Sequence, residues 1–81
     1  MKARVHITLK SGVLDPQGRA VRNALTSLGF DGIDDVRQGK YLELDLTESD
    51  AERARAAVES MCARLLANTV IEDYQIELEE A

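Results

Sequence analysis

The side chains able to carry covalent chemistry are few in this 81-residue sequence, which has one histidine, one cysteine and no tryptophan. His6 and Cys62 are the residue types of a nucleophile pair, but such pairs usually need a third group that orients the base, and the sequence offers none. Cys62 falls on an apolar helical stripe, where a buried and inert thiol is ordinary, and His6 alternates outward on a predicted strand. We therefore predict no catalytic residues in this chain.

Ligands for a metal ion or a phosphate group are also poorly arranged. Glu72, Asp73 and the acidic residues of 77–80 belong to a predicted strand whose alternate side chains point to opposite faces, and the ligand pattern of a calcium loop is absent. A glycine and an arginine follow a predicted helix start, as in phosphate cradles, but Asp15 repels anions there and Pro16 removes an amide donor. We predict no metal site and no cofactor-binding site.

The elements that would position these residues follow from the hydrophobic pattern, which has period two in strands and 3.6 in helices. Asp15 and Pro16 are typical of a helix start, and Gly29 of a helix end. Ser49 and Glu52 match a capping box, which predicts the second helix start. The predicted elements are strands over residues 3–10, 33–46 and 71–78 and helices over residues 16–28 and 50–66.

The middle strand is the ambiguous element, because Gly39 lies inside it. A glycine within a strand often marks a bulge or bend, so we predict one long bent strand over 33–46, with a hairpin through Gly39 as the alternative. The fold class is then α+β: a small, mainly antiparallel sheet with two helices on one face, in β-α-β-α-β order, near the ferredoxin-like plan. We expect one domain over residues 1–81, with exposed sheet edges that favour pairing with another copy.

Composition narrows the class of protein further. Hydrophobic residues make up 44% and charged residues 31%, as in folded domains, and no apolar run reaches the roughly 20 residues of a membrane helix. A lone cysteine favours a reducing, cytoplasmic location. The net charge is −5 overall, with +3 in residues 1–40 and −8 in residues 41–81. This acidic balance disfavours nucleic-acid binding and suits complementary protein contacts.

Four segments together resemble the PurS family over essentially the whole chain. They are Leu9–Gly18 (LKSGVLDPQG), Leu28–Phe30 (LGF), Val36–Lys40 (VRQGK) and Leu65–Tyr74 (LLANTVIEDY). Their order and spacing match, with one departure: the family usually has a proline where this chain has Thr69. Threonine permits the same exit from the second helix with less rigidity.

The resemblance implies a non-catalytic structural subunit of phosphoribosylformylglycinamidine (FGAM) synthase, an ATP-dependent, glutamine-using C–N ligase of de novo purine (IMP) biosynthesis. It implies a homodimer or tetramer that bridges a synthetase subunit, PurL, and a glutaminase subunit, PurQ, and assists ammonia transfer between them. ATP and Mg would be used by the synthetase subunit, with no cofactor in this chain.

We predict partner contacts from the two motif loops, because loops carry function more often than cores do. The predicted contact residues are Lys10, Gly12, Asp15, Pro16, Gln17 and Gly18 in the first loop and Arg37, Gly39 and Lys40 in the second. Asp15, Pro16 and Gly18 also have a purely structural explanation as a helix start.

The alternative function is a small dimeric α+β regulatory module that binds an amino acid or another small ligand. Such a module would bind a small molecule saturably on its own, whereas a bridging subunit would show only partner-dependent activity.

Overall fold

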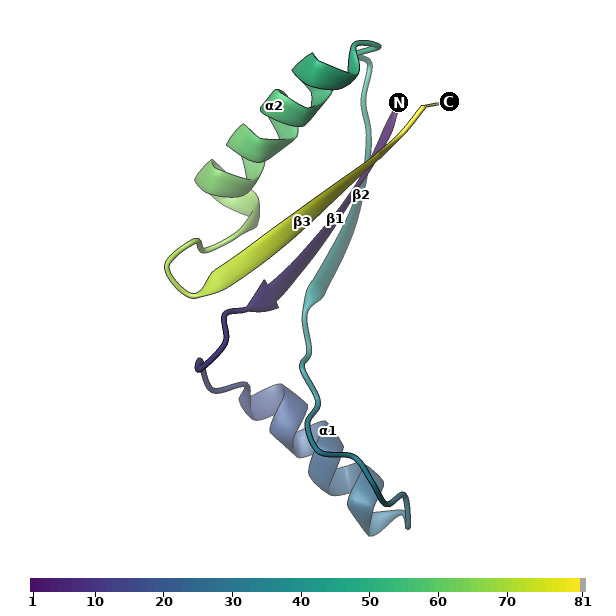
Figure 1. Cartoon of the computed structure of the whole chain (residues 1–81), viewed down its shortest axis with the longest axis vertical. Helices are drawn as coiled ribbons and strands as arrows, with labels where there is room; N and C mark the ends of the chain where they lie inside the picture. The colour runs from purple at the N-terminus through teal and green to yellow at the C-terminus, as the bar shows by residue number, and fades with distance from the viewer. Residues whose placement is uncertain (81) are drawn as a thin grey trace.

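The computed structural model describes residues 1–80, which form an antiparallel sheet of three strands and two α-helices in β-α-β-α-β order. The elements are β1 (Lys2–Leu9), α1 (Pro16–Ser27), β2 (Lys40–Asp45), α2 (Ala51–Met61) and β3 (Glu72–Glu79). A π-helical turn, η1 (Cys62–Leu66), extends α2 (Figure 1). The predicted α+β class is confirmed.

The core lies between the sheet and α2. β1 is the central strand, in the order β2-β1-β3, and its side chains Val5 and Ile7 are fully buried. Val5 lies opposite Leu42 of β2 and Ile76 of β3, so period-two alternation brings apolar side chains from all three strands to one face. α2 and η1 cover that face with the fully buried residues Ala54, Val58 and Cys62.

The opposite face of the sheet is polar and open. Lys2 pairs with Glu43 at 3.1 Å, Arg4 pairs with Glu79, and the His6 ring lies 4.8 Å from that of Tyr41 between centroids. Exposed ion pairs of this kind contribute little to stability, so the sheet is held mainly by its apolar face.

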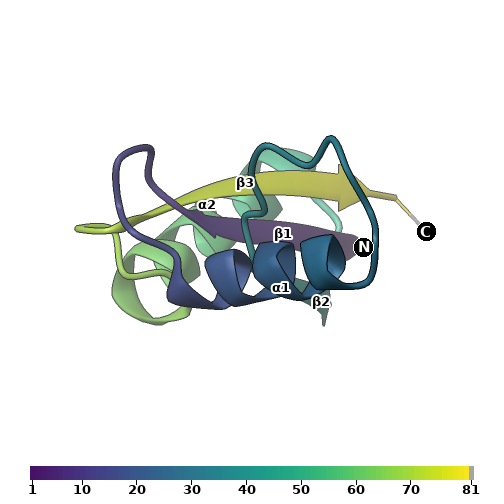
Figure 2. The ribbon, with the colours of Figure 1, turned by 90° about the horizontal axis from the view of Figure 1, so that it is seen from below.

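α1 is not where the sequence analysis placed it. Both helices were expected on one face of the sheet, but α1 projects beyond the end of the strands while α2 alone lies over them (Figure 1). Figure 2, which looks along the long axis, shows α1 at the near end with the sheet and α2 behind it. The radius of gyration is 16.0 Å, against about 12 Å for a compact chain of this length.

The predicted long strand over 33–46 is wrong, and so is the hairpin alternative. β2 begins at Lys40, and residues 33–39 pair with no strand among residues 1–80. Their backbone groups bind side chains instead: the amide of Gln38 donates to Asp15, and the carbonyl of Ile33 accepts from Arg22. Hydrogen bonds to the side chains of Asp15 and Arg22 therefore take the place of the backbone hydrogen bonds that a paired strand would make.

The start of α2 also differs from prediction. The cap is Asp50, not Ser49: the Asp50 carboxylate accepts a hydrogen bond from the Glu52 amide at 3.0 Å. Serine and aspartate are both good capping residues, and the chain uses the one nearer the first apolar turn.

Replacing Ile7 with alanine tests whether the single sheet–α2 core carries stability. Ile7 is fully buried in the central strand, so Ile7→Ala should lower the free energy of unfolding by about 2–5 kcal/mol. Chemical denaturation at fixed protein concentration measures the loss. Thr8→Ala, on the open face of the same strand, should change stability by less than about 0.5 kcal/mol. Equal losses for the two variants would contradict this description of the core.

Candidate partner-binding surfaces

Asp15 joins the start of α1 to the segment that returns from α1 to the sheet. One oxygen of its carboxylate accepts from the Gly18 amide at 2.8 Å, which caps α1, and the other accepts from the Gln38 amide at 2.7 Å. These two amides, Gly18 first, hold the pKa of the Asp15 carboxyl below its usual value. Asp15 is therefore an anion that ties the helix start to the returning chain.

Arg37 makes a second tie between the same segments. Its Nη2 donates to the carbonyl oxygens of Leu9, at 2.6 Å, and Lys10, at 3.0 Å. Farther along α1, Nε of Arg22 donates to the carbonyl oxygen of Ile33 at 3.1 Å. We call the two tied segments, residues 10–15 and 33–39, the neck. They connect the sheet to α1.

Two glycines allow the backbone to approach its neighbours closely at the two ends of the neck. A Cβ on Gly18 would lie 2.0 Å from the carbonyl oxygen of Val36, and one on Gly39 would lie 2.3 Å from that of Ile7. Gly12 has a φ of +87°, which favours glycine for a different reason, the left-handed turn after β1. Each glycine of the motif thus has a structural requirement.

The structure brings the nine predicted contact residues together around the neck. Lys10 pairs with Asp73 at 3.2 Å, Lys40 pairs with Glu72 at 3.5 Å, and Pro16 and Gln17 are exposed at the start of α1. Asp15, Gly18, Arg37 and Gly39 serve intramolecular contacts. Contact of this set with a partner stays a prediction.

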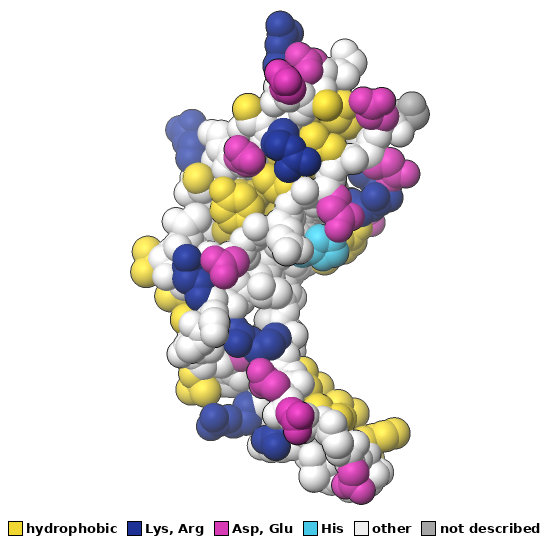
Figure 3. All heavy atoms as spheres, in the orientation of Figure 1, with side chains coloured by type: hydrophobic (Ala, Val, Ile, Leu, Met, Phe, Trp, Pro, Cys, Tyr) yellow, Lys and Arg dark blue, Asp and Glu magenta, His cyan; other side chains and the backbone are white. Residues whose placement is uncertain are grey.

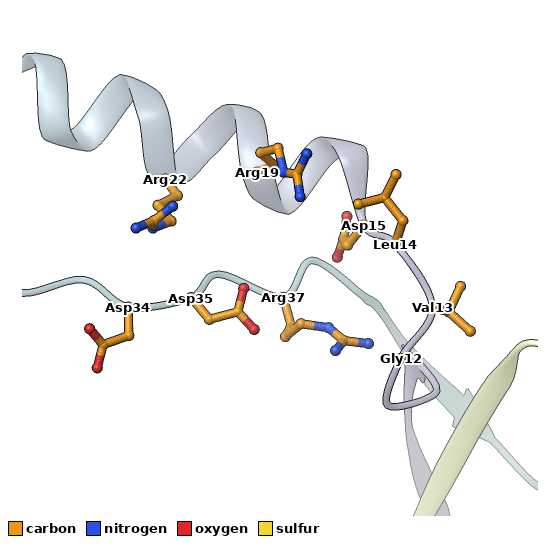
Figure 4. A pocket seen from close by; sticks show the side chains of 9 residues that line it. All are labelled: Gly12, Val13, Leu14, Asp15, Arg19, Arg22, Asp34, Asp35 and Arg37. Carbon is orange, nitrogen blue, oxygen red and sulfur yellow. The ribbon is translucent and has the colours of Figure 1, made fainter.

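A groove of about 410 Å³ runs between α1 and the neck. Figure 4 shows Arg19 and Arg22 on α1 facing the extended segment that carries Asp34, Asp35 and Arg37, with residues 12–15 closing one end. Arg37 was predicted from the sequence as a contact residue, whereas Arg19 and Arg22 were not. Their spacing of three on one helix was the signal that could have found them.

α1 also carries an uncovered apolar surface. Leu28 is 74% exposed and Val21 is 40% exposed, and Phe30, just after the helix, is 57% exposed. Apolar side chains gather at this end of the molecule (Figure 3). On the sheet, the leucines of β2 and the apolar residues of β3 are only partly buried, because one helix covers the face. Both surfaces are of the kind that partners cover.

His6 and Cys62, the two residue types of a nucleophile pair, do not come together. His6 points to the open face of the sheet, whereas Cys62 is buried on the other side, where desolvation raises the pKa of its thiol. The described residues hold no group of three or more His, Cys, Asp or Glu side chains that could bind a metal ion. None of the described helices is long and apolar enough to span a membrane.

Comparisons with known proteins agree on one family. Residues 2–80 match the family model PurS, described as phosphoribosylformylglycinamidine (FGAM) synthase. Over 79 residues the chain is 52% identical to the phosphoribosylformylglycinamidine synthase subunit PurS of Bacillus subtilis, covering 98% of this chain and 93% of that protein. The PurS subunit of Methanocaldococcus jannaschii is 43% identical over 79 residues, with 98% and 95% covered.

Solved structures agree with the sequence relatives. The crystal structure of M. jannaschii PurS, described as one of the subunits of formylglycinamide ribonucleotide amidotransferase in the purine biosynthetic pathway, superposes with a TM-score of 0.89 at 44% identity, covering 99% of this chain and 96% of that one. A chain of the PurLQS structure from Thermotoga maritima gives a TM-score of 0.86 at 28% identity, with 94% and 93% covered. The extended shape with α1 beyond the sheet therefore belongs to a fold shared with these structures.

Replacing Gly18 with alanine tests the close contact in the neck. In an open helix, glycine to alanine would stabilise by about 1 kcal/mol, but here the added methyl meets the Val36 carbonyl. Gly18→Ala should therefore lower the free energy of unfolding by about 1–3 kcal/mol, measured by denaturant titration. Gln17→Ala, one residue earlier and exposed, is the control. A Gly18→Ala variant that is as stable as wild type would contradict the tight neck.

Proposed function

Because the chain belongs to the PurS family, we propose that it is the small, non-catalytic subunit of FGAM synthase in de novo purine biosynthesis. The observation that carries the proposal is the full-length match: the chain aligns with PurS subunits from end to end and superposes on a chain of a PurLQS structure. The lack of a catalytic or metal-binding grouping in residues 1–80 fits a subunit whose partners supply the chemistry.

The role within the complex is to bridge the synthetase subunit, PurL, and the glutaminase subunit, PurQ. Ammonia released from glutamine is lost if it meets bulk water, so a sealed junction between the two active sites has value. A small, rigid subunit with several uncovered surfaces suits such a junction. This chain has three such surfaces: the apolar side of α1, the groove and the open sheet face. In this scheme the synthetase subunit uses ATP and Mg.

The chain forms a homodimer in which the second copy covers the apolar side of α1. The accessible surface is 5889 Å², whereas a compact monomer of this mass exposes about 4,800 Å². The excess, of the order of 1,000 Å² per chain, is comparable to the roughly 800 Å² that each partner buries in a stable interface. The half-covered apolar face of the second copy's sheet offers the complementary surface.

Reconstitution tests the subunit role. We expect the PurL and PurQ subunits of the same organism to have little glutamine-dependent synthase activity alone and to regain it when this chain is added. An FGAM-formation assay with glutamine, compared with the same assay with free ammonia, measures the effect. Full glutamine-dependent activity without the chain would contradict the proposal, and saturable binding of glutamine to the isolated chain by calorimetry would favour the regulatory-module alternative.

A charge on the apolar side of α1 tests the homodimer. Leu28→Asp puts a carboxylate in place of a leucine side chain that is 74% exposed in the single chain. The variant should therefore keep its fold but lose the interface between the two copies. Light scattering after size exclusion should give a mass near 9 kDa for the variant and about twice 8.9 kDa for wild type. Ala56→Asp, on the exposed side of α2, should remain dimeric. A dimeric Leu28→Asp variant would contradict this interface.

A further inference from the structure

The groove between α1 and the neck contains three arginines that have no carboxylate partner. Every ion pair among residues 1–80 involves the sheet or α2, and none joins Arg19, Arg22 or Arg37 to an acidic group within 4.0 Å. These three nevertheless line one groove, from α1 on one side and the extended segment on the other (Figure 4). Unpaired guanidinium groups that converge on one space are available to a ligand.

Hydrogen bonds to backbone carbonyl oxygens fix two of these guanidinium groups but occupy only some of their N–H donors. Arg37 donates through Nη2 to two carbonyl oxygens, and Arg22 donates through Nε to one. A guanidinium group carries further N–H donors in a planar fork that matches a carboxylate, so each retains donors that can face the groove. The Arg19 side chain makes no hydrogen bond or ion pair with any other described residue, so all of its N–H donors are available to a ligand; only its backbone amide is bonded, to the Asp15 carbonyl oxygen.

The acidic residues of the groove decide which anion it suits. Asp15 has both carboxylate oxygens occupied by backbone amides, and one oxygen of Asp35 accepts from the Val36 amide. With Asp34 they balance the three arginines, so the lining has no formal net charge. A free, multiply charged phosphate needs a positive site to offset its desolvation. A single carboxylate presented by a protein surface needs only the local guanidinium fork.

From these contacts we propose that the groove binds an aspartate or glutamate side chain carried by one of the partner subunits, with Arg19 as the principal donor and Arg22 and Arg37 beside it. This inference rests on the proposed function and specifies one of its contacts. The arginine side of α1 differs from the apolar side that carries Val21 and Leu28, so one helix can serve the second copy and a different partner at the same time.

Charge reversal of Arg19 is the sharpest test, because this side chain has no hydrogen bond or ion pair among the described residues to lose. A glutamate near the start of a helix is favourable to the helix, so Arg19→Glu should fold normally. Arg55→Glu, an exposed arginine on α2 that also lacks an ion pair among the described residues, is the matched control. Circular dichroism and thermal unfolding verify that both variants are folded.

Affinity for the purified PurL and PurQ subunits, measured separately by biolayer interferometry at two salt concentrations, gives the readout. Arg19→Glu should weaken binding to one subunit by about tenfold or more and reduce the salt dependence, whereas Arg55→Glu should change it less than about twofold. Arg19→Lys keeps the positive charge but loses the planar guanidinium fork, so it should weaken binding by an amount between those two.

Three results would overturn the inference. Wild-type affinity for both subunits in Arg19→Glu would show that the groove makes no such contact. Saturable binding of inorganic phosphate to the isolated chain, lost in Arg19→Glu, would make the groove a small-anion site. If wild-type chain binds neither subunit, the proposed function itself fails, an outcome distinct from the other two.

Discussion

The paired hydrogen bonds to the Asp15 carboxylate are the interaction on which the shape of this protein depends. One oxygen caps α1 through Gly18 and the other holds the returning chain through Gln38. Because the two amides belong to segments 20 residues apart in the chain, a single side chain sets both the start of α1 and the path of residues 33–39. Arg37 and the two closely packed glycines fix the same junction from the sheet side. Together with the hydrogen bond from Arg22 to Ile33, this junction orients α1.

A helix held away from the sheet leaves two apolar surfaces uncovered, and this connects the fold to its role. In a self-contained α+β domain both helices would cover the sheet, and the excess surface would disappear. Here the neck prevents that closure and leaves these surfaces open to the other chains of the proposed complex. In the proposed role the chain acts in assembly: it offers an apolar helix side, a guanidinium groove and an open polar sheet face.

Local signals in the sequence were sufficient for most of the secondary structure. The alternation of Val5 and Ile7 predicted β1, and Asp15 with Pro16 predicted the start of α1, because each signal depends on neighbouring residues alone.

The error at residues 33–39 has a different origin: apolar residues around a glycine predict a strand, but whether that strand pairs depends on distant partners such as Arg22. The position of α1 was missed for the same reason, since its apolar stripe predicts burial without saying against which chain. The motif residues around Asp15 were predicted, but their intramolecular contacts could be seen only in the structure. Arg19 and Arg22 were missed because a spacing of three places two arginines on one side of a helix without saying which segment faces them.

In the proposed complex, the neck and its groove are surfaces that the partner subunits cover. Amide hydrogen exchange, followed by mass spectrometry on the free chain and on the chain in complex with PurL and PurQ, tests it most directly. We expect slower exchange over residues 10–15 and 33–39 in the complex, with little change over the buried strand β1. Unchanged exchange of both neck segments, in a complex that turns over glutamine, would contradict it.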